Sequence, residues 1–176
     1  MGDSISEELV DIYDKENKPN GMVKSRAEAH KSRLFHRTVH IWVYTADSKV
    51  LIQLRANTEQ NPNLWDLSVA GHVDAGEEPV DAAVREIKEE LGIGIERSKL
   101  EFIMINRDSY HFQYVYIFRF DGMLNKLKPQ LEEVRELSLV PIDEFENGLR
   151  TSPDKYVMRG QYWFEMINEI RNRCKV

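Results

Sequence analysis

The segment from residue 79 to residue 91 constrains the fold more than any other part of the sequence, because its apolar residues repeat with the period of a helix. These residues stand at relative positions 0, 4, 7 and 11 and are Val80, Val84, Ile87 and Leu91. That spacing predicts one buried helical stripe. Pro79 suits a first helical turn, and Gly92 suits the left-handed position just after a helix. We therefore expect a helix that packs on one face.

Segments with strand character lie on both sides of this helix. We expect strands at residues 38–44, 50–54, 100–106, 112–120 and 136–140, and a closing helix at residues 161–173. The first two strands flank a turn at Asp47-Ser48 and should form an antiparallel pair. Strands interleaved with a few helices predict a mixed α/β domain.

The first 35 residues are expected to be an N-terminal extension, and residues 36–176 one domain. Within the extension, apolar residues alternate around a turn signal, Pro19-Asn20-Gly21, which suggests a small hairpin. The remaining residues contain no internal repeat or low-complexity linker. A chain of 176 residues suits one compact domain with short additions.

Composition and charge exclude several classes of function. A formal net charge of -6 argues against broad binding to nucleic acid polymers, which normally requires a basic face. No apolar run approaches the roughly 20 residues of a membrane span, and the first residues lack the pattern of a secretory signal. The single Cys174 cannot form an internal disulfide. We expect a cytoplasmic protein without a membrane partner, and a homodimer is left open.

Three acidic residues of the predicted helix stand at positions i, i+3 and i+4, namely Glu86, Glu89 and Glu90. Carboxylates at this spacing are neighbours on one helical surface, where each like-charge pair costs about 0.2–0.5 kcal/mol. Such a cluster can be a solvated acidic face. It can also hold Mg²⁺, which prefers oxygen ligands and often bridges to phosphate.

Residues outside the cluster favour the metal site. Gly71 ends a predicted strand, where a glycine lets its backbone oxygen approach an ion. Glu77 lies eight residues before Arg85, and a contact between the two would tie the loop to the helix.

The same residues resemble the signature of the Nudix hydrolase superfamily. Gly71, five residues, Glu77, seven residues and then residues 85–93, Arg-Glu-Ile-Lys-Glu-Glu-Leu-Gly-Ile, match every defined position of the Nudix box. The resemblance implies an α/β/α sandwich around a mixed sheet, in which a small organic diphosphate is hydrolysed with Mg²⁺ or, as an alternative, Mn²⁺.

The resemblance also implies roles for individual residues. Metal ligands would be the carboxylates of Glu86, Glu89 and Glu90 with the carbonyl of Gly71, whereas Glu77, Arg85 and Gly92 would be structural. Family members differ in the position of their general base. We assign that role to Glu86 or Glu89, with the loop acids Glu132 and Glu133 as outside candidates.

Three residues that are not defined positions of the box are candidates for substrate binding. Arg55 ends the second predicted strand, and in proteins that resemble this one an arginine there often faces substrate phosphates. The histidines raise the question of a further metal, but no tight His-x-x-x-His pattern is present. His40 is expected to pack within a strand or face solvent, whereas His36 and His72 are the better candidates.

Two other functions have to be weighed against hydrolysis. Residues 29–44 and Ala70-Gly71-His72 also look like the type 1 isopentenyl-diphosphate isomerases. That family uses a cysteine shortly after a tryptophan and an acidic pair on a later strand. Here residues 66–70 hold no cysteine, and residues 111–113 hold no glutamate pair. A Nudix-shaped binding module would be expected to lose its metal ligands, which are all present here, so hydrolysis is favoured.

Overall fold

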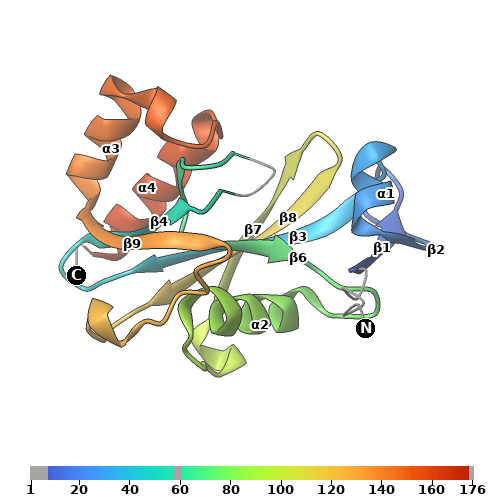
Figure 1. The fold of residues 1–176 in the computed structure, drawn as a ribbon, viewed down its shortest axis with the longest axis horizontal. Coiled ribbons are helices and arrows are strands. Elements are labelled where there is room, and N and C mark those ends of the chain that lie inside the picture. The colour runs from blue at the N-terminus through green and yellow to red at the C-terminus, as the bar shows by residue number, and fades with distance from the viewer. Residues whose placement is uncertain (1–7, 58–60, 175–176) are drawn as a thin grey trace.

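The computed structural model of the chain describes residues 8–57 and 61–174 (Figure 1). Residues 1–7 of the predicted extension, residues 58–60 and residues 175–176 lie outside the described residues. The strands are β1 Leu9–Tyr13, β2 Pro19–Ser25, β3 His36–Tyr44, β4 Lys49–Arg55, β5 Trp65–Asp66, β6 Val69–His72, β7 Glu101–Asp108, β8 His111–Arg119 and β9 Val134–Pro141. The α-helices are α1 Arg26–Lys31, α2 Pro79–Leu91, α3 Ile142–Thr151 and α4 Gln161–Arg173.

A mixed seven-stranded sheet is the centre of the fold. Its strands follow the order β5-β4-β3-β8-β7, with β6 also paired to β3 and β9 paired to β4. The long central strands β3 and β8 are parallel, from His36 beside His111 to Tyr44 beside Arg119. The other pairings in this sheet are antiparallel. The predicted antiparallel pairing of β3 with β4 is present, next to their turn.

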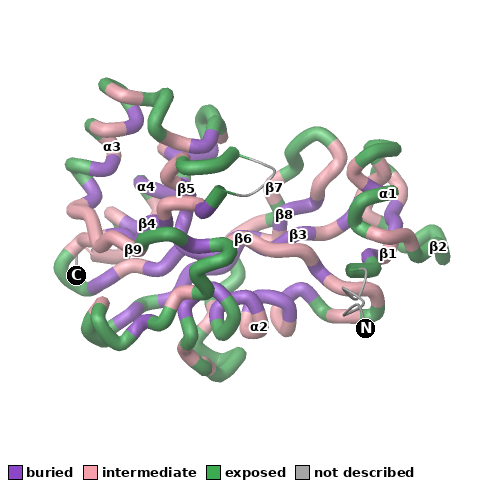
Figure 2. The backbone as a smooth tube through the Cα atoms, viewed as in Figure 1, coloured by how far each residue is buried: buried purple, intermediate pink, exposed green. Residues whose placement is uncertain are grey.

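Helices cover the two faces of this sheet, which confirms the predicted α/β/α sandwich. Helix α2 lies on one face, and α3 and α4 lie on the other (Figure 1). Many of the buried residues lie in the sheet, between these helical layers (Figure 2). One apolar cluster joins α2 to Val39, Ile41 and Val43 of β3. A second joins α3 and α4 to Trp42, on the opposite side of the same strand. Because side chains alternate between the two faces along β3, this strand contributes residues to two hydrophobic cores.

The N-terminal residues form a hairpin of β1 and β2 followed by α1. Its turn is not at Pro19-Asn20-Gly21, as the sequence suggested, because these residues open β2. The turn lies earlier, where the Asp14 carboxylate accepts hydrogen bonds from the backbone N–H groups of Glu16 and Lys18, both at 2.9 Å. The asparagine before Lys18 takes the left-handed conformation, with φ of 62°. An aspartate-centred turn thus replaces the proline-glycine signal. The proposed domain boundary at residue 35 stays a prediction.

Two helices are absent from the sequence prediction. Helix α1 begins at Arg26 after Ser25, whose hydroxyl accepts a hydrogen bond from the Glu28 backbone N–H. Helix α3 follows directly on β9 and buries Ile142, Phe145 and Leu149. None of the helices among residues 8–57 and 61–174 is long and apolar enough to cross a membrane.

Candidate active site

Helix α2 turns two of its three clustered glutamates toward the sheet. Glu86 and Glu90 are 8% and 3% exposed, whereas the Glu89 side chain is half exposed. The alternative of a solvated acidic face is therefore wrong for two of the three carboxylates. The predicted apolar stripe also needs correction at one position, because Val84 is only half-buried and its place in the packed face is taken by Ala83.

Gly71 of β6 lies directly against the Glu86 carboxylate. A Cβ atom at this position would clash with the carboxylate carbon and oxygens of Glu86. Only glycine therefore allows the helix and β6 to come this close. The structure thus brings the backbone of Gly71 and the carboxylate of Glu86 into one place, as the motif predicts.

The positive charge near the two buried carboxylates is too small to offset the free-energy cost of burying them. Burial raises the pKa of Glu86 to about 7, although Arg85 opposes this shift. Burial and the neighbouring Glu86 raise the pKa of Glu90, while hydrogen bonds from the Gln53 side chain, at 2.8 Å, and from the Ala70 backbone oppose the rise. Without a cation, each carboxyl is driven toward its protonated form. A divalent ion would relieve this cost, so the donor set fits a metal such as Mg²⁺.

Arg85 ties the loop before α2 to the helix and to the sheet. Its guanidinium donates two hydrogen bonds to Glu77, at 3.1 and 2.9 Å, so the contact expected from the sequence is present. It also donates to Glu86 at 2.8 Å, to Glu89 at 3.1 Å and to the backbone carbonyl of His72 at 2.8 Å. One side chain therefore holds two of the clustered glutamates and the strand that carries Gly71.

The helix ends as its sequence predicts. Gly92 adopts the left-handed conformation with φ of 69°, and its backbone N–H donates to the carbonyl of Lys88. A Cβ atom at Gly92 would also clash with the backbone of Lys128. Gly92 therefore fixes the end of α2 against the following loop.

Arg55 lies at the end of β4 beside a buried carboxylate that the sequence interpretation did not identify. Its Nη1 is 3.7 Å from Oδ2 of Asp66, which is 1% exposed. Arg159 donates to both oxygens of Asp66, at 2.7 Å each. This triad joins residues far apart in sequence, and Arg159 also lines a cavity of about 650 Å³ on the α4 side of the molecule. The cavity lining includes none of the α2 carboxylates.

The predicted candidates His36 and His72 come together with His30, which the sequence interpretation did not select. The Nε2 atoms of His30 and His72 are 2.9 Å apart, and the rings of His36 and His72 stack at 5.3 Å. His111 lies against His36 with the ring centroids 4.7 Å apart. Burial lowers the pKa of His36 to about 4 and that of His111 to about 3. His40 is buried elsewhere, and its Nδ1 is 3.1 Å from the Tyr162 hydroxyl.

The carboxylate cluster and the histidine cluster lie on opposite faces of β6. Gly71 faces α2 and Glu86, while His72, the next residue, turns to the side that holds His36 and His30. This follows from the alternation of side chains along a strand. Two adjacent residues of one short strand thus contribute to two separate groups.

Of the two loop acids, Glu133 has the stronger electrostatic effect on the clustered glutamates. Its charge contributes to the raised pKa of both Glu86 and Glu90. Its backbone carbonyl accepts a hydrogen bond from the Ala56 N–H at 2.9 Å, just beyond β4. Glu132 is exposed. The structure thus favours Glu133 over Glu132 as an additional acid near the site.

Comparisons with known proteins agree with this architecture. The family model described as NUDIX domain matches residues 34–160. An uncharacterized Nudix hydrolase of Clostridium acetobutylicum is 33% identical over 184 residues, which cover 98% of this chain and 86% of that protein. Nudix hydrolase 3 of Arabidopsis thaliana is 30% identical over 98% of this chain, but the chain spans only 24% of that protein's length.

Isomerases are also among the relatives. Isopentenyl-diphosphate Delta-isomerase 2 of Photorhabdus laumondii is 28% identical, over 92% of this chain and 90% of that protein. Among solved structures, a crystal structure of a Deinococcus radiodurans protein has a TM-score of 0.70 at 20% identity and covers 96% of this chain and all of that one. This last likeness supports the fold.

Proposed function

Because the chain belongs to the Nudix hydrolase family of pyrophosphohydrolases, we propose that it cleaves the phosphoanhydride bond of a nucleoside diphosphate-type or other organic diphosphate with Mg²⁺. Mn²⁺ is the alternative ion. The observation that carries this proposal is the pair of buried carboxylates, Glu86 and Glu90, packed beside Gly71. Buried acids without matching positive charge are costly unless a cation joins them.

The proposed ligands are the carboxylates of Glu86, Glu89 and Glu90 and the carbonyl of Gly71. A bound Mg²⁺ would offset charge on the diphosphate and lower the pKa of water beside it. Arg85 holds the loop and two of the carboxylates in position through its five donated hydrogen bonds.

The reaction itself adds the oxygen of water to phosphorus and breaks the P–O bond of the anhydride, which releases two phosphorylated fragments or a phosphate. A carboxylate oxygen of Glu86 or Glu89 takes the proton of the attacking water. Glu133 is the outside candidate, because its charge already acts on Glu86.

Three further side chains are proposed to bind substrate. Arg55 would grip phosphate oxygens, since a guanidinium can donate two parallel hydrogen bonds to phosphate. The neighbouring Asp66 supports this role by restricting its position. His36 and His72, on the other face of β6, would contact the organic part of the substrate.

The experiment that tests the reaction class uses ¹⁸O-labelled water and a panel of nucleoside diphosphates and triphosphates, nucleotide sugars, dinucleotides and coenzymes with Mg²⁺. We expect the label to enter a phosphate-containing product. The compound with the highest kcat/KM would then identify the substrate class. An absence of product from every compound, in protein with confirmed folding and metal content, would contradict hydrolysis.

The isomerase relatives make isomerisation the second candidate. The segments that would carry a cysteine and an acidic pair are residues 66–70 and 111–113, and they offer Ser68, His111 and Gln113 instead. None of these supplies both a protonating and a deprotonating group on opposite sides of an allylic carbon. We therefore expect no solvent deuterium to enter isopentenyl diphosphate. Deuterium incorporation without phosphate release would reverse the ranking.

The raised pKa of Glu86 predicts a pH effect on the metal-free protein. A carboxyl whose pKa rises from 4.5 unfolded to about 7 folded binds more protons in the folded state between these values. The free energy of unfolding therefore falls as pH rises through this window. Glu86→Gln removes this penalty, so the variant should gain roughly 5 °C in melting temperature relative to wild type between about pH 5 and about pH 8.

The quantity to compare is the difference in melting temperature between wild type and Glu86→Gln, because the buried histidines contribute equally to both proteins. The lowered pKa values of these histidines raise the free energy of unfolding as pH rises, opposite to the effect of Glu86, and they do so in both proteins. Saturating Mg²⁺ should stabilise wild type more than Glu86→Gln and reduce the gap at high pH. If the melting temperatures of the two proteins differ by the same amount at every pH, with or without Mg²⁺, then the burial of Glu86 is not the source of the pH effect.

The cellular location and the partners of the protein are proposed from its sequence. The single cysteine cannot form an internal disulfide, which favours a reducing compartment such as the cytoplasm. A negatively charged chain with a small-molecule site is not expected to bind nucleic acid polymers. A homodimer is left to measurement by light scattering.

A further inference from the structure

The cavity of about 650 Å³ on the α4 side of the molecule has not yet been given a role. It is lined by the end of α3, the start of α4, the segment that joins the two helices, and part of the chain before β5. Most of its wall consists of apolar and aromatic side chains, which include Leu64, Leu149, Tyr156, Val157, Trp163 and Phe164. Pockets of this size with such a lining commonly bind small organic molecules.

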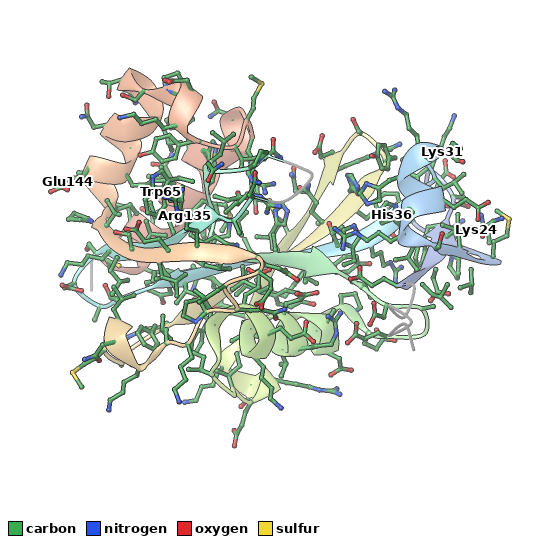
Figure 3. All side chains as sticks on the ribbon, viewed as in Figure 1. Lys24, Lys31, His36, Trp65, Arg135 and Glu144 are labelled. Carbon is green, nitrogen blue, oxygen red and sulfur yellow. The ribbon has the colours of Figure 1, made fainter. Side chains whose placement is uncertain are left out.

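Contacts behind the wall hold the cavity in shape. The Nε1 of Trp163 donates to the carbonyl of Val157 at 3.0 Å, and the N–H of Val157 donates to the carbonyl of Trp65 at 2.9 Å. Trp65 lies on the side of the sheet that α3 and α4 cover (Figure 3). The guanidinium of Arg150 stacks over the ring of Phe164, 4.4 Å from its centroid. Because these walls are already ordered, a ligand loses little free energy in arranging them.

The cavity adjoins Arg55, the residue proposed to bind phosphate. The carbonyl of Leu64, in the cavity wall, accepts a hydrogen bond from the backbone N–H of Arg55 at 3.0 Å. Arg159, also in the wall, donates to Oδ2 of Asp66 at 2.7 Å. The Nη1 of Arg55 lies 3.7 Å from the same oxygen. Two separate contacts therefore connect the wall of the cavity to Arg55.

The end of β4 also borders the carboxylates of α2. Ala56 follows Arg55, and its N–H donates to the carbonyl of Glu133 at 2.9 Å. The charge of Glu133 acts in turn on Glu86 and Glu90. Arg55 thus lies between the cavity and the proposed metal site, so a phosphate bound by Arg55 can carry an organic group into the cavity.

We propose that the cavity binds the apolar end of the organic group of the substrate, so that the preferred diphosphate carries an alkyl or aryl body there rather than a sugar. An apolar ring gains free energy when it leaves water for this wall. Sugar hydroxyls placed against the same wall would lose hydrogen bonds to water without replacement. That the bound ligand is a substrate rests on the proposed hydrolysis, whereas the binding itself requires no turnover.

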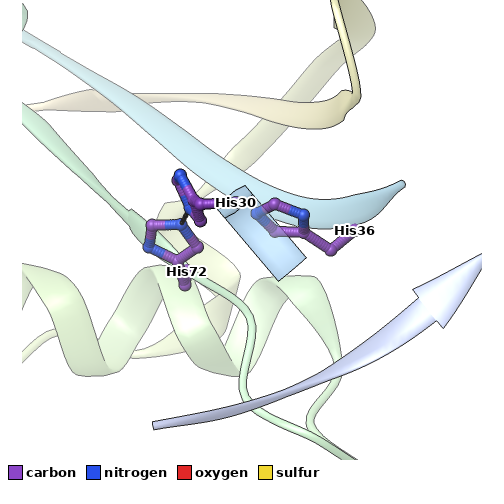
Figure 4. A group of neighbouring side chains, drawn as sticks. All are labelled: His30, His36 and His72. Carbon is purple, nitrogen blue, oxygen red and sulfur yellow. Dashed lines mark hydrogen bonds between the residues drawn. The ribbon is translucent and has the colours of Figure 1, made fainter. Parts of the chain in front are cut away.

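The histidine cluster is a different part of the molecule. Figure 4 shows His30, His36 and His72 together beside α2, and none of them is among the described residues that line the cavity. The contacts proposed for His36 and His72 therefore concern another part of the substrate.

The test is a calorimetric titration of the full-length protein, without Mg²⁺, with cyclohexyl phosphate, phenyl phosphate and glucose 1-phosphate. These ligands share a phosphate and a ring of similar size, and they differ in the polarity of the ring. We expect the apolar ligands to bind about tenfold more tightly than the sugar phosphate, or better, because their rings leave water more readily. The tighter of the two apolar ligands identifies the group as alkyl or aryl.

Two tryptophan substitutions on α4 locate the binding. Gln161 is exposed, begins α4 and lines the cavity, so Gln161→Trp should fold and fill part of the space. The preference for the apolar ligands should disappear in this variant. Glu165→Trp is the matched control, because Glu165 is exposed on the same helix and is not among the described residues of the cavity wall. It should keep the preference of wild type.

Equal affinity of wild type for the three ligands would overturn the proposal, as would the same preference in folded Gln161→Trp and in Glu165→Trp. The titrations involve no turnover, so they are independent of the hydrolysis panel. A preference for the apolar ligands without hydrolysis of any diphosphate would contradict the proposed function alone, and the cavity would remain a site for apolar phosphorylated ligands.

Discussion

Glu90→Gln is expected to reduce turnover by roughly 10²-fold or more while the protein still folds, the effect of losing a key electrostatic group. Glutamine keeps the shape of the side chain and removes the negative charge that the metal needs. The Gln53 amide, which donates to Glu90 at 2.8 Å, can donate to the new carbonyl oxygen. Because burial penalises the charged form of Glu90, the neutral variant should melt no lower than the metal-free wild type. Initial rates at saturating substrate, over a range of Mg²⁺ concentrations, measure the effect.

The matched control is Glu144→Gln on α3. This glutamate is exposed and lies far from α2, on the other face of the sheet (Figure 3). Its substitution should change neither turnover nor the Mg²⁺ dependence. Near-normal activity of Glu90→Gln at limiting Mg²⁺ would show that the metal assignment is wrong.

Arg85→Ala should damage stability and activity together. The substitution removes the partner of Glu77, Glu86 and Glu89 and leaves the His72 carbonyl without this donor. Its side chain is 29% exposed, so we expect a loss of about 2–3 kcal/mol, less than for a fully buried pair. That loss corresponds to a fall in melting temperature of roughly 5–10 °C. Activity should fall at least about tenfold because the strand carrying Gly71 loses its support.

Arg119→Ala is the matched control for Arg85→Ala. Arg119 is exposed and pairs only with nearby Asp121 among the salt bridges of the described residues. Its loss should cost at most about 1 kcal/mol, as for other surface pairs. Calorimetric melting and kcat/KM of the two variants should be measured in one buffer with Mg²⁺. An Arg85→Ala protein with unchanged melting temperature and full activity would refute the structural role of this residue.

The parts of the fold that depend on local spacing could be predicted from sequence. Helices α2 and α4 begin and end at the predicted residues, and in α2 the apolar period and the end signals agree. The motif likewise indicated that Gly71 would meet the acidic helix. Helix α3 also carried a readable pattern in Ile142, Phe145 and Leu149 at i, i+3 and i+7, and the sequence interpretation did not use it.

Features that depend on distant residues could not be predicted in the same way. Spacing alone put three glutamates on one helical surface, but only the sheet beneath α2 shows that Glu86 and Glu90 are buried. His30 and His72 meet because α1 packs near the end of β6, and no local pattern joins them. The pair of buried Asp66 and partly buried Arg159 spans 93 residues. Such contacts become visible only in three dimensions.

The parallel pairing of β3 with β8 also determines how this chain can fold. β3 pairs along its full length with β8, and β4 pairs with β9, so each of these early strands has one neighbour that comes from much later in the chain. Loop closure has to precede these contacts, and non-local pairing of this kind slows folding. During synthesis, β3 and β4 emerge from the ribosome long before their partners. One edge of each strand therefore stays unpaired until β8 and β9 have been made, which makes this interval the period of greatest risk of aggregation.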